Sequence, residues 1–135
     1  MTRHNKCDRP RVVITGLGAM SPLGESPDSL WDGLVSGTSG IDNMTITDPT
    51  EFPCKFSGEV LGFDPTAYMD RKEARRMGRF SQFAVAAAQQ ALIHSELDLD
   101  KEDRERIGVV LGNGSGGYPE TEQAVRTLVA RGGMK

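Results

Sequence analysis

Two short apolar runs, at residues 11–16 and 107–111, contain the β-branched residues typical of buried strands. Each is followed directly by a glycine-rich stretch, which predicts a turn. Neither run alternates between apolar and polar positions. Because strands in antiparallel sheets with one wet face do alternate, the two runs favour a parallel sheet that is covered on both faces. Residues 55–60 predict a further short strand.

Helical periodicity appears between these runs. Ser26-Pro27-Asp28 is a strong helix start, since serine caps, proline suits the first helical position and aspartate complements the dipole. The apolar positions that follow have the spacing of one helix face, and Gly37 ends the helix. They are Leu30, Trp31, Leu34 and Val35.

A long alanine-rich helix is predicted to begin at Lys72 or Arg79 and to end near Ser95, because its apolar residues keep an i, i+3, i+4 rhythm. Asp64-Pro65 opens a short helix or turn, and residues 120–131 predict a last helix. Residues 37–54 and 96–105 have loop composition. The alternation of strands and helices indicates an α/β fold, with a polar leader at residues 1–10 and one domain over residues 11–135.

Composition narrows the functional class. The 135 residues are 37% hydrophobic and 26% charged with a net charge of −3, so no global charge favours nucleic acid or a membrane surface. No apolar stretch is long enough for a transmembrane helix, and the polar start is unlike a signal peptide. Cys7 and Cys54 are too few for a disulfide framework and lack CxxC spacing, which favours a reducing cytoplasm.

The charge is distributed unevenly. A basic block at residues 71–79 precedes an acidic block at residues 96–105. On a continuous helix, Lys72, Arg75, Arg76 and Arg79 would share one face. Such a stripe suits an acidic or phosphorylated partner. The alternative is a solvated face paired internally with Glu73.

Residues 112–117 match the G-x-G-x-x-G pattern of dinucleotide-binding loops, after a predicted strand and before a predicted helix. The acidic residue that usually follows about 20 positions later has no counterpart, because residues 123–135 contain no Asp or Glu. The alternative is that these glycines allow close backbone packing.

Nucleophilic and metal chemistry have little support in these residues. His4 and His94 have no evident nucleophile as a partner, and His94 near a helix end is typical of a surface residue. Cys54 fits a small buried residue better than a nucleophile. The sequence contains no Gly-x-Ser-x-Gly elbow and no metal-ligand pair.

Five strings in register resemble the condensing enzymes of fatty-acid and polyketide synthesis, the β-ketoacyl-acyl carrier protein synthases. The opening RVVITGLGAMSPLG at 11–24 is the first, with Leu30-Trp31 and GTSGI at 37–41 continuing it. The others are FSGEV at 56–60, FDP at 63–65, MDRKEARRM at 69–77 and IGVVLGNGSGG at 107–117. Within the family, the chain is most similar to the N-terminal part of the bacterial elongating synthases of the second type.

The resemblance implies a thiolase-like, layered α/β/α/β/α fold, of which this chain is an incomplete N-terminal half. It also implies an acyltransferase that joins an acyl thioester to malonyl-carrier protein by decarboxylative Claisen condensation. The family's cysteine on a strand-to-helix elbow and its two histidines lie further along the family's chain than Lys135. We therefore carry over no catalytic residue and expect this fragment to be inactive by itself.

Two sites carry over by position. The basic segment matches the family's docking patch for the acidic acyl carrier protein, which assigns that role to Lys72, Arg75 and Arg76, with Arg71 adjacent. Ser115 matches a position in the glycine turn that lines the acyl pocket. The elongating synthases typically have a bulky apolar gate there, so serine leaves the chain-length preference open.

The resemblance further implies acyl and malonyl thioesters as substrates, no cofactor or metal, and a homodimer for the full-length parent. Three alternatives remain open: a polyketide ketosynthase or chain-length factor lacking the cysteine, a non-enzymatic fragment that binds carrier protein, and a nucleotide-binding α/β domain.

Overall fold

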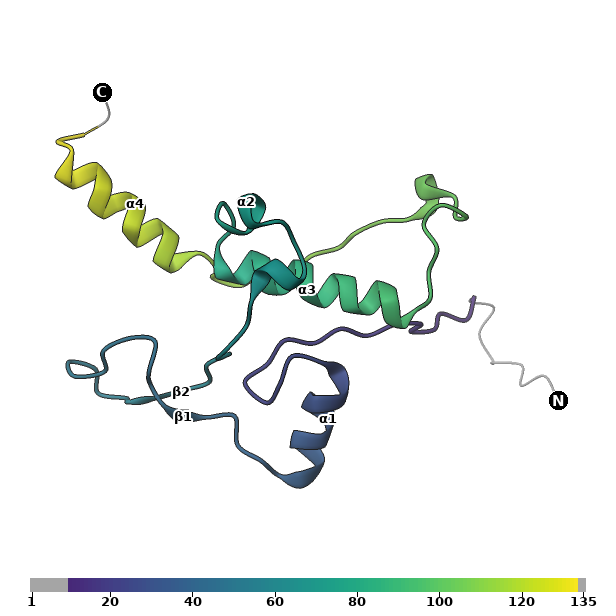
Figure 1. Cartoon of the computed structure of the whole chain (residues 1–135), viewed down its shortest axis with the longest axis horizontal. Coiled ribbons are helices and arrows are strands. Elements are labelled where there is room, and N and C mark those ends of the chain that lie inside the picture. Colours follow the sequence, from purple (N-terminus) through teal and green to yellow (C-terminus); the bar gives the residue numbers. More distant parts are fainter. Residues whose placement is uncertain (1–9, 134–135) are drawn as a thin grey trace.

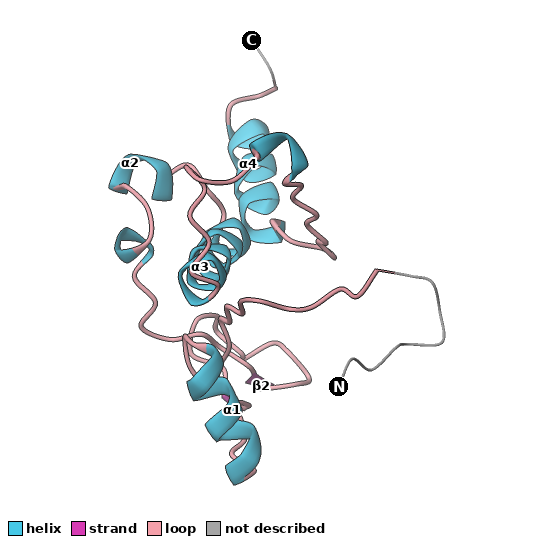
Figure 2. Cartoon of the chain, turned by 90° about the vertical axis from the view of Figure 1, so that its right-hand side faces the viewer, coloured by secondary structure: helices cyan, strands magenta, loops and turns pink. Residues whose placement is uncertain are grey.

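A computed structural model describes residues 10–133 as short helices joined by long loops (Figures 1 and 2). The predicted leader lies almost entirely outside the described residues. The helices are α1 (Pro27–Ser36), α2 (Arg71–Ala74), α3 (Arg79–His94) and α4 (Tyr118–Ala130), with single 3-10 turns at Pro65–Ala67 and Arg104–Arg106; the strands are β1 (Asp42–Asn43) and β2 (Phe56–Ser57).

The predicted parallel sheet is absent from residues 10–133. Residues 11–16 and 107–111 run as extended chain without a ladder partner (Figure 1), and the sheet that forms pairs β1 with β2 antiparallel. Both apolar runs are exposed and not buried, with exposed fractions of 89% at Val12 and 99% at Val110. A strand needs neighbouring strands to bond its backbone, and the described residues do not supply them.

The long helix α3 organises the molecule, and the glycines of residues 16–18 lie directly on it. A Cβ atom at Gly18 would be 1.8 Å from the carbonyl oxygen of Ala87, and one at Gly16 would be 2.1 Å from that of Ala91. The segment runs antiparallel to α3, because its later residues meet earlier residues of the helix. These two glycines therefore serve close backbone packing.

Two glutamines on α3 bind the loops around the helix. Gln90 accepts a hydrogen bond from the Ala19 amide through Oε1 (3.0 Å) and donates through Nε2 to the Glu25 carbonyl (2.6 Å) and the Tyr68 hydroxyl (3.1 Å). Gln89 donates to the Tyr68 carbonyl (2.6 Å). Polar side chains on this helix thus satisfy groups that the loops cannot pair among themselves.

The buried core is small and lies against the first half of α3. Phe63, Ala74 and Ala86 are the buried apolar residues of the described chain. The Phe63 ring stacks on Tyr68 at 5.9 Å and meets Phe83 edge-on at 5.0 Å between centroids. Such aromatic pairs add about 0.5–1.5 kcal/mol each beyond the area they bury.

Local helix signals are confirmed. Ser26 and Ser29 form a reciprocal capping box at the start of α1, Pro27 follows the cap, and Gly37 ends the helix with a left-handed φ of 70°. Asp64 caps the 3-10 turn at Pro65–Ala67. After α3, Glu96 takes a left-handed φ of 54°, a conformation that a side chain makes costly.

The segment between α1 and Phe63 was predicted as a loop over residues 37–54 and a strand over 55–60, and each prediction was partly right. Glu59 organises this loop: its carboxylate accepts hydrogen bonds from the amides of Thr45 and Ile46 and from the hydroxyls of Thr45 and Ser57. Chiefly because of the Thr45 hydroxyl, the pKa of Glu59 falls from 4.5 to about 2.

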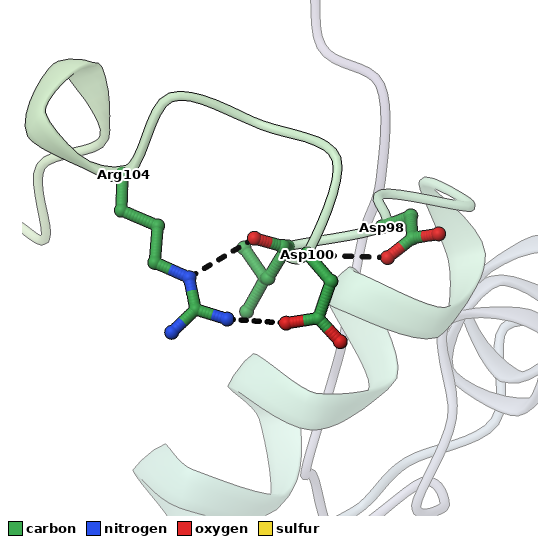
Figure 3. Close-up of polar contacts among 4 residues, drawn as sticks. Asp98, Asp100 and Arg104 are labelled. Atoms are coloured by element: carbon green, nitrogen blue, oxygen red, sulfur yellow. Dashed lines mark hydrogen bonds and ion pairs between the residues drawn. The ribbon is translucent and has the colours of Figure 1, made fainter.

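The acidic block lies in turns after α3, as its composition predicted, and it is partly neutralised from within (Figure 3). Arg104 pairs with Asp100 and donates through Nε to the Leu99 carbonyl (3.0 Å), while Lys101 pairs with Asp98 at 2.7 Å. No helix in residues 10–133 is long and apolar enough to cross a membrane.

The glycine contact with α3 can be tested by Gly18→Ala. The added methyl would overlap the α3 backbone, which cannot move aside as a side chain can, so we expect a loss of about 1–3 kcal/mol of unfolding free energy in the complete protein. Gly108→Ala is the matched control, because no atom lies within 4 Å of its Cβ position. Equal midpoints for the two variants in urea unfolding would contradict the close packing.

The loop around Glu59 predicts a pH dependence. Its folded pKa of about 2 lies below the unfolded value near 4.5, so the bonds to Thr45 and Ile46 are complete above pH 4.5 and are lost as the pH falls through 2. We expect the amide proton shifts of Thr45 and Ile46 to titrate with a midpoint near 2 in NMR spectra. In Glu59→Gln this titration should vanish, and a midpoint near 4.5 in the unmodified protein would refute the prediction.

Candidate functional site

The basic segment begins on a one-turn helix. Asp70 caps α2 by accepting hydrogen bonds from the amides of Lys72 (2.7 Å) and Glu73 (3.0 Å). Ala74, at 6% exposure, is the residue through which α2 contacts the core. The single turn therefore presents Arg71 and Lys72 to solvent from a fixed point.

The predicted continuous face of residues 72, 75, 76 and 79 is wrong. Helix α2 ends at Ala74, and α3 begins only at Arg79. Gln82 explains how the break is tolerated: its Nε2 donates to the carbonyls of Ala74 (2.8 Å) and Met77 (3.3 Å), which satisfies acceptors at the interruption. Gln82 is itself buried, and the two bonds of its Nε2 stabilise the bend between the helices.

Arg79 has a structural role. Its guanidinium donates to the carbonyls of Phe63 (3.2 Å) and Val60 (3.1 Å). The same group lies 4.8 Å from the Phe63 ring centroid and 4.9 Å from that of Phe83, within cation–π distance. Arg79 thus ties the loop before α2 to the start of α3, and its guanidinium is bound there although the residue is exposed.

The other four cations of the basic segment also lie at the surface. We call Arg71, Lys72, Arg75 and Arg76 the basic cluster; all four are exposed. Within residues 10–133 the ion pairs join Lys101 to Asp98, Arg104 to Asp100 and Arg126 to Glu122, and none of them includes the basic cluster. The alternative of internal pairing with Glu73 therefore has no support in the described structure.

Ser115 lies exposed in the glycine turn at residues 112–117, which packs against the first turn of α3. A Cβ atom at Gly116 would be 2.7 Å from the Phe80 ring, and Gly117 takes a left-handed φ of 84° as the N-cap of α4. The glycine turn therefore lies beside the N-terminus of α3. The basic cluster comes just before that helix in the sequence.

The nucleotide alternative fits this geometry poorly. A dinucleotide loop leaves the following helix N-terminus open to a pyrophosphate. Here the first turn of α4 contains Pro119, which has no amide proton, and the carboxylate of Glu120. The strand expected before the glycines is also unpaired in the described chain.

The remaining candidate side chains are dispersed. Cys54 is exposed, contrary to the prediction of burial, because it lies in the loop before β2 with its Sγ 3.5 Å from the Phe56 carbonyl. His94 is exposed at the end of α3, where Nδ1 accepts a hydrogen bond from the Leu17 amide (3.1 Å). His4 and Cys7 lie outside the described residues. No group of three or more potential ligands that could hold a metal ion occurs in residues 10–133.

Two functional positions escaped the sequence reasoning. Gln82, which stabilises the bend, could have been suspected as a polar residue in an otherwise apolar helical stripe. Glu120, whose carboxylate accepts from the Arg79 amide (3.3 Å), has no such signal, because its partner lies 41 residues away.

Comparison with known proteins places these observations in a family. The model of the β-ketoacyl synthase N-terminal domain matches residues 9–134, nearly the whole chain. The chain belongs to the β-ketoacyl synthase family.

Curated relatives and solved structures agree. The chain is 42% identical to 3-oxoacyl-(acyl-carrier-protein) synthase 2 of Synechocystis sp. and 43% identical to that of Vibrio cholerae, in each case over 93% of this chain and 30% of the relative. A β-ketoacyl synthase from Burkholderia phymatum matches 91% of the chain with a TM-score of 0.70 and 31% identity, over 30% of its own length. The chain therefore spans about a third of the proteins it resembles.

A third comparison concerns a ketosynthase seen with its acyl-carrier protein in a type II polyketide synthase. It matches 89% of this chain and 32% of its own with a TM-score of 0.70 and 26% identity. These likenesses support the expected N-terminal part of a thiolase-like condensing enzyme, although the parallel sheet is not formed within residues 10–133.

Proposed function

We propose that this chain is the N-terminal part of a 3-oxoacyl-acyl carrier protein synthase that elongates fatty acids. The identity of 42–43% to synthases 2 over 93% of the chain supports this reading. In the proposed reaction a cysteine thiolate first takes the acyl chain from its carrier protein. Malonyl-carrier protein then loses carbon dioxide, and the carbanion attacks the acyl thioester, so that a carbon–carbon bond forms as the thiolate leaves.

Catalysis in this proposal uses a cysteine and two histidines, and we assign none of them to a Cys or His of this chain. The chain instead contributes binding surfaces. Its cysteine usage fits a cytoplasmic enzyme, and the resemblance implies a homodimer for the whole protein.

The single observation that carries the binding role is the exposed, unpaired basic cluster. Four cations sit within six residues on a fixed turn, and no carboxylate of the described chain neutralises them. An acidic carrier protein fits such a surface, since Arg and Lys favour carboxylate partners. The ketosynthase that was solved with its acyl-carrier protein has a similar fold over most of this chain.

The acyl pocket is assigned to the glycine turn through Ser115. Two glycines of the turn, Gly112 and Gly114, have open space around their Cβ positions, with no atom within 4 Å. A small serine there leaves more room for a growing chain than a bulky gate would.

A polyketide ketosynthase or chain-length factor is the second candidate, favoured by one observation. The ishigamide ketosynthase/chain-length factor matches 65% of this chain and 22% of its own with 34% identity and a TM-score of 0.60. The higher identity to the fatty-acid synthases over more of the chain favours the first candidate. A cysteine on the family's elbow in the complete protein separates a synthase from a chain-length factor.

The 135 residues by themselves are expected to give no condensation product, which also tests the non-enzymatic alternative. The reason is that neither Cys54, exposed in a loop, nor His94, bonded to Leu17, matches the family's catalytic groups. Incubation with acyl- and malonyl-carrier protein, followed by mass spectrometry, would check this. Any ketoacyl product above the protein-free background would refute it.

Charge reversal of the basic cluster should weaken carrier-protein binding. In the complete synthase, replacing Lys72, Arg75 and Arg76 with Glu should raise KM for acyl-carrier protein roughly tenfold at low salt, because exposed pairs contribute about 0–1 kcal/mol each. The effect should shrink at high salt as screening grows.

The matched control reverses Lys101, Arg104 and Arg126, which make the same change in net charge but are already paired at other places. Its KM should stay near that of the unmodified enzyme. Equal KM values for the two triple variants at low salt would rule out a docking role for the basic cluster.

A further inference from the structure

One carboxylate joins the starts of two helices. Glu120 lies in the first turn of α4, and its Oε1 accepts a hydrogen bond from the amide of Arg79, the first residue of α3. Figure 1 shows the two helices meeting at these ends. Helix N-termini carry partial positive charge, so a carboxylate placed between two of them is favoured by both.

Gly78 leaves room for this contact. It is the N-cap of α3 and has no side chain to bond the first amides of the helix. A Cβ atom at Gly78 would lie 2.8 Å from Cδ and Oε1 of Glu120 and also from Cε1 of Phe80, so any side chain there would crowd both groups. The cap that most helices receive from their own N-cap residue thus comes here from a different helix.

The glycine turn is held between the same partners. Gly116 and Gly117 lie on the Phe80 ring, where Cβ atoms would approach it to 2.7 and 3.2 Å. Phe80 is the second residue of α3, directly after Arg79. The turn that carries Ser115 is therefore fixed at its end by contact with Phe80 and by the bond of Glu120 to the Arg79 amide.

We infer that Glu120 is a positioning residue that holds the glycine turn at residues 112–117 against Phe80 and thereby sets which acyl chain lengths the site accepts. The inference rests on the proposed function, since it needs Ser115 to line the acyl pocket. Without the bond to Arg79, the turn is anchored by the ring contact alone. Ser115 then takes several positions, and discrimination between chain lengths declines.

The test measures kcat/KM of the complete synthase for a series of acyl-carrier protein substrates of increasing chain length. In Glu120→Ala, the ratio between the best and the poorest substrate should fall at least about threefold, because small displacements in an apolar pocket alter discrimination. Glu122→Ala is the matched control. It removes a carboxylate from the next turn of α4, one that pairs with Arg126 of its own helix, so its profile should be unchanged.

A second variant separates positioning from the effect of charge at the helix N-terminus. Glu120→Asp keeps a carboxylate in the first turn of α4 but shortens the side chain by one methylene, so that it no longer reaches the Arg79 amide. If Glu120 positions the turn, Glu120→Asp flattens the profile as Glu120→Ala does. If Glu120→Asp keeps the original profile, the charge alone matters and the inference is overturned.

Ser115→Phe distinguishes failure of the inference from failure of the proposed function. If this variant shortens the accepted chains while Glu120→Ala leaves the profile unchanged, the inference fails and the pocket assignment holds. If Ser115→Phe leaves the profile unchanged as well, the glycine turn does not line the acyl pocket, and both fail. A flattened profile in Glu120→Ala together with shortened chains in Ser115→Phe supports both.

Discussion

The contact of residues 16–19 with the alanine face of α3 is the constraint on which the rest of the structure depends. Gly18 lies so close to Ala87 that no side chain fits between the two backbones. This approach places the Ala19 amide on Gln90, and Gln90 in turn holds Glu25 and Tyr68. These bonds fix the loops near the end of α3. The basic segment and the glycine turn contact the helix nearer its start, through Gln82 and Phe80.

What the sequence predicted well was local. Caps, proline at the first helical turn and a terminating glycine act over a few residues, and α1 follows them closely. The prediction of parallel strands was wrong for a non-local reason. An apolar run such as Ile107–Leu111 specifies an extended, buried segment but not the neighbour that pairs with it, and in residues 10–133 no such neighbour is present.

At the candidate site, too, local features were predicted and non-local features were not. Exposure of Arg71 and Lys72 followed from their charge. The shared helical face did not follow, because periodicity assumes an unbroken helix, whereas Gln82 stabilises a break that only the folded chain reveals. The contact of Glu120 could not be predicted either, because its partner Arg79 is distant in the sequence, as the partner of a strand is.

Helix α2, which carries the start of the basic cluster, contributes Ala74 to the core, and Gln82 binds the carbonyl of that residue. The four cationic residues themselves are exposed. If the basic cluster docks a carrier protein as proposed, sequence change at these four positions alters the choice of partner at little cost in folding, so that partner specificity and fold can evolve separately. Arg79 differs from these four residues. Its guanidinium lies over the Phe63 and Phe83 rings, so a substitution of Arg79 also changes the packing of these rings.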